Sequence, residues 1–125
     1  MISAEKRGVD RLTEGGKAMS EEAVMWMGES GTQYKYLVAA IDAKLKKAAA
    51  NYIFARQVAS DRWIPLYIGE TDSLGERIPN HEKLPCVRQH GATHLHAHMN
   101  PEGEEVRKTE EADLIRRWGP ICNRA

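Results

Sequence analysis

The sequence lacks long apolar runs, a surplus of charge of either sign, and more than two cysteines. Apolar runs such as residues 37–41 are far shorter than the ~20 residues that span a bilayer. Residues 1–20 also lack the apolar core of a signal peptide. We therefore expect a soluble, cytoplasmic protein, in which Cys86 and Cys122 are free thiols.

The charge balance bears on possible partners. Lys and Arg together number 18, Asp and Glu also number 18, and the formal net charge is zero. Most nucleic-acid-binding proteins have an evident positive excess, so this composition argues against indiscriminate DNA binding but allows a local basic strip. The 125 residues suffice for one domain, and 42% hydrophobic and 29% charged residues are ordinary for a globular protein. Wholesale disorder and a disulfide-dependent mini-protein are thereby excluded.

The pattern along the chain predicts a flexible leader at residues 1–20 and a single domain at residues 21–125. Aromatic and β-branched content predicts strands at 34–41, 51–58, 63–69 and 93–99. A helix through residues 42–50 is the alternative for the segment after the first strand. Helices are predicted near 73–78, at 85–91 and at 102–118, the last ended by Gly119 and Pro120.

This element order predicts an α/β (α+β) domain. Its sheet is expected to be small and mainly antiparallel, with three strands plus an extra N-terminal strand, and to be flanked by helices. Strand alternation places Leu66 and Ile68 on one face, with Trp63 and Tyr67 on the other. Pro65 fits this strand only at a sheet edge or a bulge, because it has no N–H to donate.

Glu111 is a carboxylate on a face that should be apolar. It precedes Leu114 and Ile115 by three and four residues, so a helix places the three side chains together. A carboxylate there must be paired, hydrogen-bonded, metal-bound or in a pocket. An ion pair with Arg77 is the structural alternative to a functional role. The neighbouring Glu110 is turned about 100° away and is expected to be solvated.

Two spaced motifs carry the strongest functional signal. Tyr67-Ile68-Gly69 is followed by Leu74 and Arg77, in the pattern Y-I-G-x4-L-x2-R. Glu111 begins the second pattern, E-x2-L-I-x4-P-x2-N, which ends at Asn123. Together they resemble the GIY-YIG nuclease superfamily, over roughly residues 51–123. In place of the first motif, Gly-Ile-Tyr, this chain has Ala-Asn-Tyr at residues 50–52.

The resemblance implies a GIY-YIG-type fold and a divalent-metal-dependent endonuclease that hydrolyses DNA phosphodiester bonds through an activated water. It implies that Glu111 holds Mg²⁺ or Mn²⁺, that Arg77 contacts the scissile phosphate and that Tyr52 activates the water. Tyr67 and His81 would position groups or share protons, and Asn123 would brace the site.

Short basic pairs and single basic residues could supply a strip that follows the DNA phosphates. The candidates for that strip are Lys83, Arg88, Arg107 and Lys108. A chain of this length would work alone on a special DNA structure, with a partner protein, or as a homodimer. The rival hypothesis is a non-catalytic nucleic-acid- or protein-binding module on the same fold.

Four histidines form a second cluster of interest. His94, His96 and His98 alternate along one predicted strand and therefore share a face, and His90 lies just before them. Imidazoles in this arrangement could bind zinc, nickel or copper. Side chains on a straight strand run parallel rather than converging, and the cysteines lack paired zinc-ligand spacing, so a half-exposed sheet face is the favoured interpretation.

Overall fold

The computed structural model describes residues 22–124, so the predicted leader at residues 1–20 lies outside the described part of the chain. The central feature is one sheet with the strand order β1-β2-β5-β3-β4, in which every neighbouring pair is antiparallel. The strands are β1 (Ala23–Met27), β2 (Gln33–Ala40), β3 (Ala50–Ala59), β4 (Arg62–Thr71) and β5 (His94–Met99). The predicted mixed α+β class with an antiparallel sheet is confirmed, but the sheet has five strands where four were expected.

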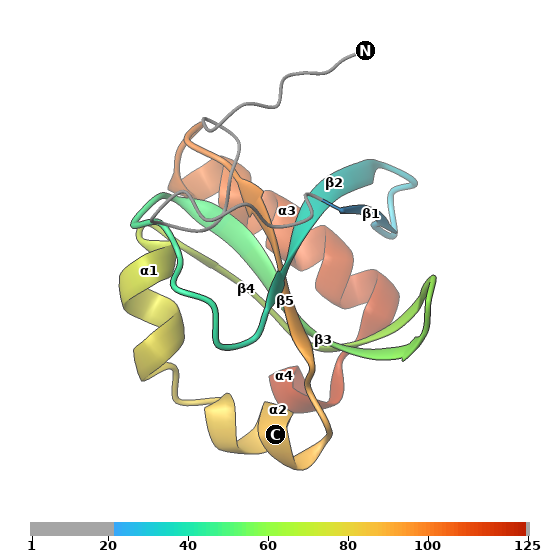
Figure 1. Ribbon diagram of the computed structural model, residues 1–125. Helices are drawn as coiled ribbons and strands as arrows, with labels where there is room; N and C mark the ends of the chain where they lie inside the picture. The colour runs from blue at the N-terminus through green and yellow to red at the C-terminus, as the bar shows by residue number, and fades with distance from the viewer. Residues whose placement is uncertain (1–21, 125) are drawn as a thin grey trace.

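Helices cover both faces of this sheet (Figure 1). They are α1 (Leu74–Arg77), the 3₁₀ helix η3 (Ile78–Asn80), α2 (Leu84–Gln89), α3 (Glu104–Trp118) and α4 (Ile121–Arg124). Successive residues of β3 alternate between the two faces, so Tyr52 and Phe54 pack with α1, η3 and α2, whereas Ile53 and Ala55 pack with Leu114 of α3. Within residues 22–124, no helix combines the length and apolar content needed to cross a membrane.

The strand that was not predicted is β1, an edge strand that pairs only with β2. Of its five residues only Trp26 is buried, which explains why its pattern gave no clear strand signal. Between β2 and β3 the chain is irregular, so the alternative helix through residues 42–50 is absent. The remaining predicted elements are present, with boundaries that move by one or two residues in most cases.

A β-bulge in the β3–β4 hairpin corrects the predicted side-chain faces. Phe54 pairs with Tyr67, and the next residue, Ala55, pairs with Pro65, so Leu66 is an extra residue on β4. The bulge puts Tyr67 on the α1 side and Trp63 on the α3 side, whereas strict alternation predicted one common face. Pro65 lies beside this bulge on an edge strand, as its missing N–H requires.

The predicted free thiols are wrong, because Cys86 and Cys122 form a disulfide. The bond joins α2 to α4 across 36 residues of sequence, and the two Cα atoms are 6.0 Å apart. The prediction rested on cellular compartment, which carries no information about which residues the fold brings together.

Most of the buried residues of α3 are polar, and this overturns the prediction for Glu110. Glu110 is buried and not solvated: its carboxylate accepts a hydrogen bond of 2.6 Å from Tyr36 and lies 2.9 Å from Nδ1 of His98. Arg107 and Asp113 are buried on the same helix, whereas Glu111 is only half-buried. The side of α3 that faces the sheet is therefore broad, and Glu110 rather than Glu111 lies near its centre.

Candidate functional site

Tyr52 and Tyr67 lie on the same sheet face, on either side of Gly69. Tyr52 on β3 is directly opposite Gly69 on β4, and the two tyrosine ring centroids are 6.3 Å apart. A Cβ at Gly69 would lie 2.6 Å from both Cζ and Oη of Tyr52. The glycine therefore leaves the space in which the buried Tyr52 ring crosses β4, which gives a physical reason for Gly at this position of the motif.

His81 packs against both tyrosines. Its ring centroid lies 4.9 Å from that of Tyr67 and 5.6 Å from that of Tyr52, and Nε2 is 2.6 Å from Oη of Tyr52. The backbone N–H of Lys83 donates to Nδ1 of His81 over 3.0 Å, so Nδ1 must be unprotonated in the neutral ring. The proton of neutral His81 is then on Nε2, which donates it to the Tyr52 oxygen.

The pKa values define the protonation state of this pair. Burial raises the pKa of Tyr52 well above its ordinary value, with a further rise from Tyr67 and an opposing effect from Arg77. Burial, followed by the positive charge of Arg77, lowers the pKa of His81 to about 4. Near pH 7 the pair is therefore a neutral imidazole that donates to a neutral phenol.

Arg77 lies at the end of α1, close to the tyrosines. Its Nη1 is 2.8 Å from the exposed carboxylate of Glu82, and Nη2 makes a second contact of 3.1 Å, so the guanidinium binds the carboxylate with both arms. Arg77 lowers the pKa of Glu82 to about 2. An anion already occupies the planar fork that would suit two phosphate oxygens.

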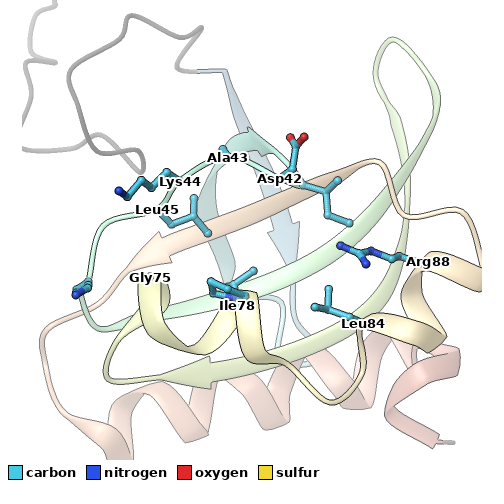
Figure 2. Close-up of a pocket in the computed structure, with 11 residues that line it drawn as sticks. Asp42, Ala43, Lys44, Leu45, Gly75, Ile78, Leu84 and Arg88 are labelled. Carbon is cyan, nitrogen blue, oxygen red and sulfur yellow. The ribbon is translucent and has the colours of Figure 1, made fainter.

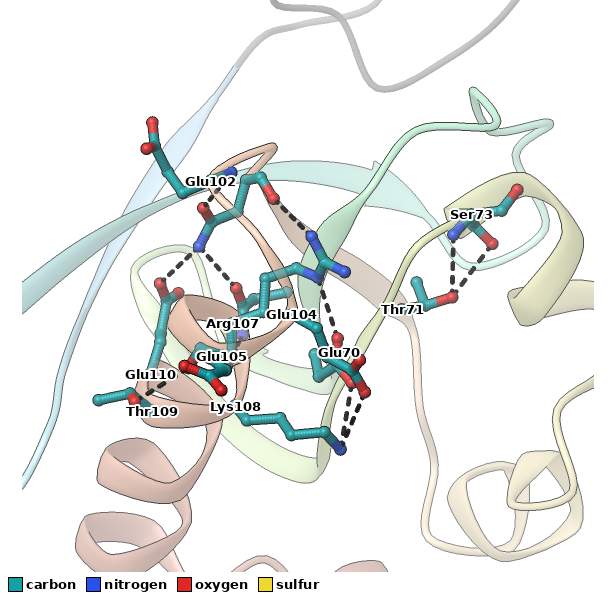
Figure 3. A network of polar contacts seen from close by, with 12 residues as sticks. Glu70, Thr71, Ser73, Glu102, Glu104, Glu105, Arg107, Lys108, Thr109 and Glu110 are labelled. Carbon is teal, nitrogen blue, oxygen red and sulfur yellow. Dashed lines mark hydrogen bonds and ion pairs between the residues drawn. The ribbon is translucent and has the colours of Figure 1, made fainter.

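Glu111 approaches the same site from α3. Burial raises the pKa of its carboxyl group, and the negative charge of Glu70 adds to the rise. After burial, the charge of Glu111 is the next largest cause of the raised pKa of Tyr67. Figure 3 shows Glu70 held by Arg107 and Lys108, at 3.0 and 3.5 Å. The carboxylates of Glu70 and Glu111 thus lie near one another. Arg107 and Lys108 bind the carboxylate of Glu70 directly.

Asn123 acts on the backbone of β4. Its side chain accepts a hydrogen bond of 2.8 Å from the N–H of Ile68 and donates one of 2.9 Å to the carbonyl of the same residue. These two bonds satisfy both backbone groups of a residue on an edge strand, next to Tyr67 and Gly69. The side chain therefore braces the strand that carries part of the site.

The four residues of the predicted phosphate-binding strip do not form one surface. Arg107 is buried and binds both Glu70 and the backbone carbonyl of Asn100, so it is a structural residue rather than a phosphate ligand. Lys108 is exposed and ion-paired with Glu70. Lys83 lies two residues after His81 and contacts its ring through the backbone N–H.

Arg88 belongs to a different region. It lines a cavity of about 370 Å³, formed with residues that include Leu45, Ile78 and Leu84 (Figure 2). The cavity lining is mostly apolar and contains none of the six predicted catalytic residues. We therefore place the candidate chemistry at the tyrosine pair and not in this cavity.

The histidines on β5 do not converge on a common point, and the half-exposed face expected for them is wrong at His96, which is fully buried. Burial lowers the pKa of His96 to about 3, and its Nδ1 accepts a hydrogen bond of 3.0 Å from Trp26. Nδ1 of His94 contacts Thr93, and that of His98 contacts Glu110. Each ring therefore has its own hydrogen-bond partner.

Sequence reasoning missed two residues near the site, Glu70 and Glu82. Glu82 was hard to find because its role comes from a turn that brings it back to Arg77. Glu70 directly follows the Tyr-Ile-Gly motif and could have been noticed as an acidic residue at the same end of β4. The chain was compared with protein-family models, curated proteins and solved structures, and none of the three comparisons gives a match.

Proposed function

We propose that this protein is a GIY-YIG-type endonuclease that hydrolyses DNA phosphodiester bonds with the help of one divalent cation. The observation that supports it best is that His81, Arg77 and Glu111 all contact or electrostatically affect the packed pair Tyr52 and Tyr67. These groups come from two strands, two helices and the end of the 3₁₀ helix. Motifs that arose by chance would have no reason to bring them together.

Tyr52 is the group that activates the attacking water. His81 donates from Nε2 to the phenol oxygen, so it stabilises the phenolate form of Tyr52 without taking a proton from it. Arg77 also favours the phenolate. Because burial opposes ionisation, additional positive charge is required before Tyr52 releases its own proton to solvent, and only the resulting phenolate can accept a proton from the attacking water near pH 7.

Glu111 is the residue that holds the cation. Carboxylate oxygen is the donor that Mg²⁺ and Mn²⁺ prefer, and Mg²⁺ is commonly bound through one or two carboxylates together with substrate phosphate. Burial and Glu70 both disfavour the ionised form of Glu111, so a cation would relieve an existing electrostatic cost. When bound, the ion would supply Lewis-acid stabilisation of phosphate charge and lower the pKa of nearby hydroxyl groups.

Arg77 binds the scissile phosphate in this proposal. Its planar fork matches two phosphate oxygens, and hydrogen bonds to the extra charge of the pentavalent state would lower the barrier. The substrate phosphate must displace the exposed carboxylate of Glu82, which now binds both arms of the guanidinium.

Nicking of supercoiled plasmid in Mg²⁺ or Mn²⁺ tests the proposal. Tyr52→Phe, Arg77→Ala and Glu111→Gln are each expected to reduce the rate by about a hundredfold or more. Glu105→Gln, an exposed change on the same helix as Glu111, is the matched control and should nick at the wild-type rate. Absence of nicking by the wild type, or wild-type rates in all three variants, would overturn the proposal.

A non-catalytic binding module is the second candidate. Zero net charge and the missing glycine of the first motif favour it, because both depart from an effective nuclease. Gel-shift titration combined with the nicking assay separates the two candidates. A binding module would shift DNA in the gel, or bind a protein partner, but would not nick plasmid with any divalent metal. Its affinity would be the same in the Glu111→Gln variant.

A further inference from the structure

Cys86, His90 and Cys122 form a cluster away from the tyrosine site. Their sulfur and imidazole nitrogen atoms all lie within 4.8 Å of one another. Cys86 lies on α2, His90 is the residue that caps the C-terminus of that helix, and Cys122 is on α4. Two cysteines and one histidine are a common ligand set for zinc, as in sites of the Cys₂His type with an open fourth position.

Local structure explains how the three residues meet. Cys86 and His90 are four residues apart, so α2 places them on one face, and Nδ1 of His90 is 3.9 Å from Sγ of Cys86. The α4 helix follows the αL residue Gly119 and brings Cys122 against α2. No zinc motif is visible in the sequence, because the second cysteine is 36 residues from the first.

We propose that the reduced protein binds one Zn²⁺ through the thiolates of Cys86 and Cys122 and the imidazole of His90, and that the disulfide excludes the metal. With Zn–S of about 2.3 Å and Zn–N of about 2.1 Å, a tetrahedron needs sulfur–nitrogen spacings of about 3.6 Å and a sulfur–sulfur spacing of about 3.8 Å. The 3.9 Å between Cys86 and His90 is close to the first value. Cα atoms 6.0 Å apart allow the second by rotation about Cα–Cβ.

The chemical steps balance with one named reductant. A phosphine and one water reduce the disulfide to two thiols, and the phosphine becomes its oxide. Zn²⁺ then displaces two thiol protons, one from each cysteine. Nδ1 of His90, which is 2.9 Å from the carbonyl of Cys86, gives up that hydrogen bond and becomes a ligand, and the ring proton moves to Nε2.

Burial leaves room for this exchange on one side only. Cys122 is fully buried, whereas Cys86 and His90 are half-buried, so reductant and metal reach the cluster from the α2 side. A water ligand would complete the tetrahedron. The soft donor set selects Zn²⁺ or Co²⁺ over the Mg²⁺ or Mn²⁺ proposed at Glu111.

Cobalt titration of the full chain tests the site. Protein reduced with tris(2-carboxyethyl)phosphine and desalted without oxygen should take up one Co²⁺, show a thiolate-to-cobalt charge-transfer band, and lose that band when Zn²⁺ is added. The oxidised protein should show none. Cys86→Ser and Cys122→Ser should abolish the band, and His90→Ala should weaken binding about tenfold or more. His94→Ala is the matched control and should bind as the wild type does.

The cysteine variants make the titration decisive for this cluster. Circular dichroism checks the fold of each variant, and Cys86→Ser still tests the site if the buried Cys122→Ser fails to fold. Reduced wild type that binds no metal overturns the proposal. So does a Cys86→Ser variant that folds and binds Co²⁺ with the same band, since the metal would then be held elsewhere.

Discussion

Gly69→Ala offers a direct test of how Tyr52 is positioned. Gly69 is not among the glycines with positive φ, so its backbone would accept an alanine. Alanine in a strand is favoured over glycine by about 0.5–1 kcal/mol because it loses less conformational freedom on folding. On backbone grounds alone, the substitution should therefore stabilise the protein.

The contacts of the new methyl group predict the opposite sign. The added Cβ would lie 2.6 Å from Cζ and Oη of Tyr52, well inside van der Waals contact. Tyr52 is 1% exposed and is packed against Phe54 and His81, so its ring has little room to move. Overpacking of this kind costs about 1–3 kcal/mol. After the gain in propensity is subtracted, we expect a net loss of about 1–2 kcal/mol.

Urea denaturation of Gly69→Ala, Tyr52→Phe and the double variant measures this effect. Tyr52→Phe removes Oη and one of the two closest contacts, so the double variant should lose less free energy of unfolding than the two single variants summed. The Gly69→Ala variant should also lose plasmid nicking, because the bond from His81 to Tyr52 is displaced. If the variant is as stable as the wild type or more stable, Tyr52 does not pack over β4 as described.

Three further predictions use other parts of the structure. Arg107→Ala should lower the free energy of unfolding by about 3 kcal/mol, because it breaks the buried ion pair with Glu70. Lys108→Ala removes an exposed partner of the same carboxylate and should change the free energy of unfolding by less than about 0.5 kcal/mol. Equal losses of the two variants in urea titration would contradict this difference. The pKa of His81 is lowered to about 4, so on acidification the unfolded state takes up a proton before the folded state does. The free energy of unfolding should therefore fall between about pH 6.5 and pH 4, by up to about 3 kcal/mol. Thermal melts of His81→Gln should show a smaller dependence of stability on pH over that interval, and the same dependence as the wild type above it. Glu82→Gln removes the anion that competes for Arg77 and should tighten DNA binding severalfold in a gel shift, and unchanged or weaker binding would show that the fork of Arg77 does not receive phosphate.

The spacing of residues could predict the relative placement of Tyr67, Gly69 and Arg77 because these three residues are close together in the sequence. Tyr67, Gly69 and Arg77 lie within eleven residues on one strand, turn and helix, so a motif on this segment fixes their relative positions. The bulge at Leu66 could not be predicted in this way. A period of two assigns faces correctly only while the strand pairs without an extra residue, and the bulge depends on the partner strand.

Long-range partners explain the remaining errors. The disulfide joins residues 36 positions apart, and no feature of the isolated sequence brings α4 to α2. Glu110 was predicted to be solvated because the positions of residues along one helix give no information about Tyr36 and His98, its partners on the sheet. Helical periodicity identifies the buried face of a helix by its apolar residues. On α3, however, most of the buried side chains are polar and are paired through hydrogen bonds and ion pairs.

Those buried polar contacts also bear on the proposed function, because they fix the rotation of α3 about its axis. Glu110 bonds to Tyr36 at 2.6 Å and Arg107 bonds to Glu70 at 3.0 Å, so the helix is anchored to β2 on one side and to β4 on the other. A rotation that moved Glu111 away from the tyrosines would leave two buried charges without partners, at a cost of several kcal/mol. An apolar stripe tolerates sliding and small rotations far better, because its contacts are not directional. The polar face of α3 therefore fixes where the half-buried carboxylate of Glu111 lies relative to the sheet.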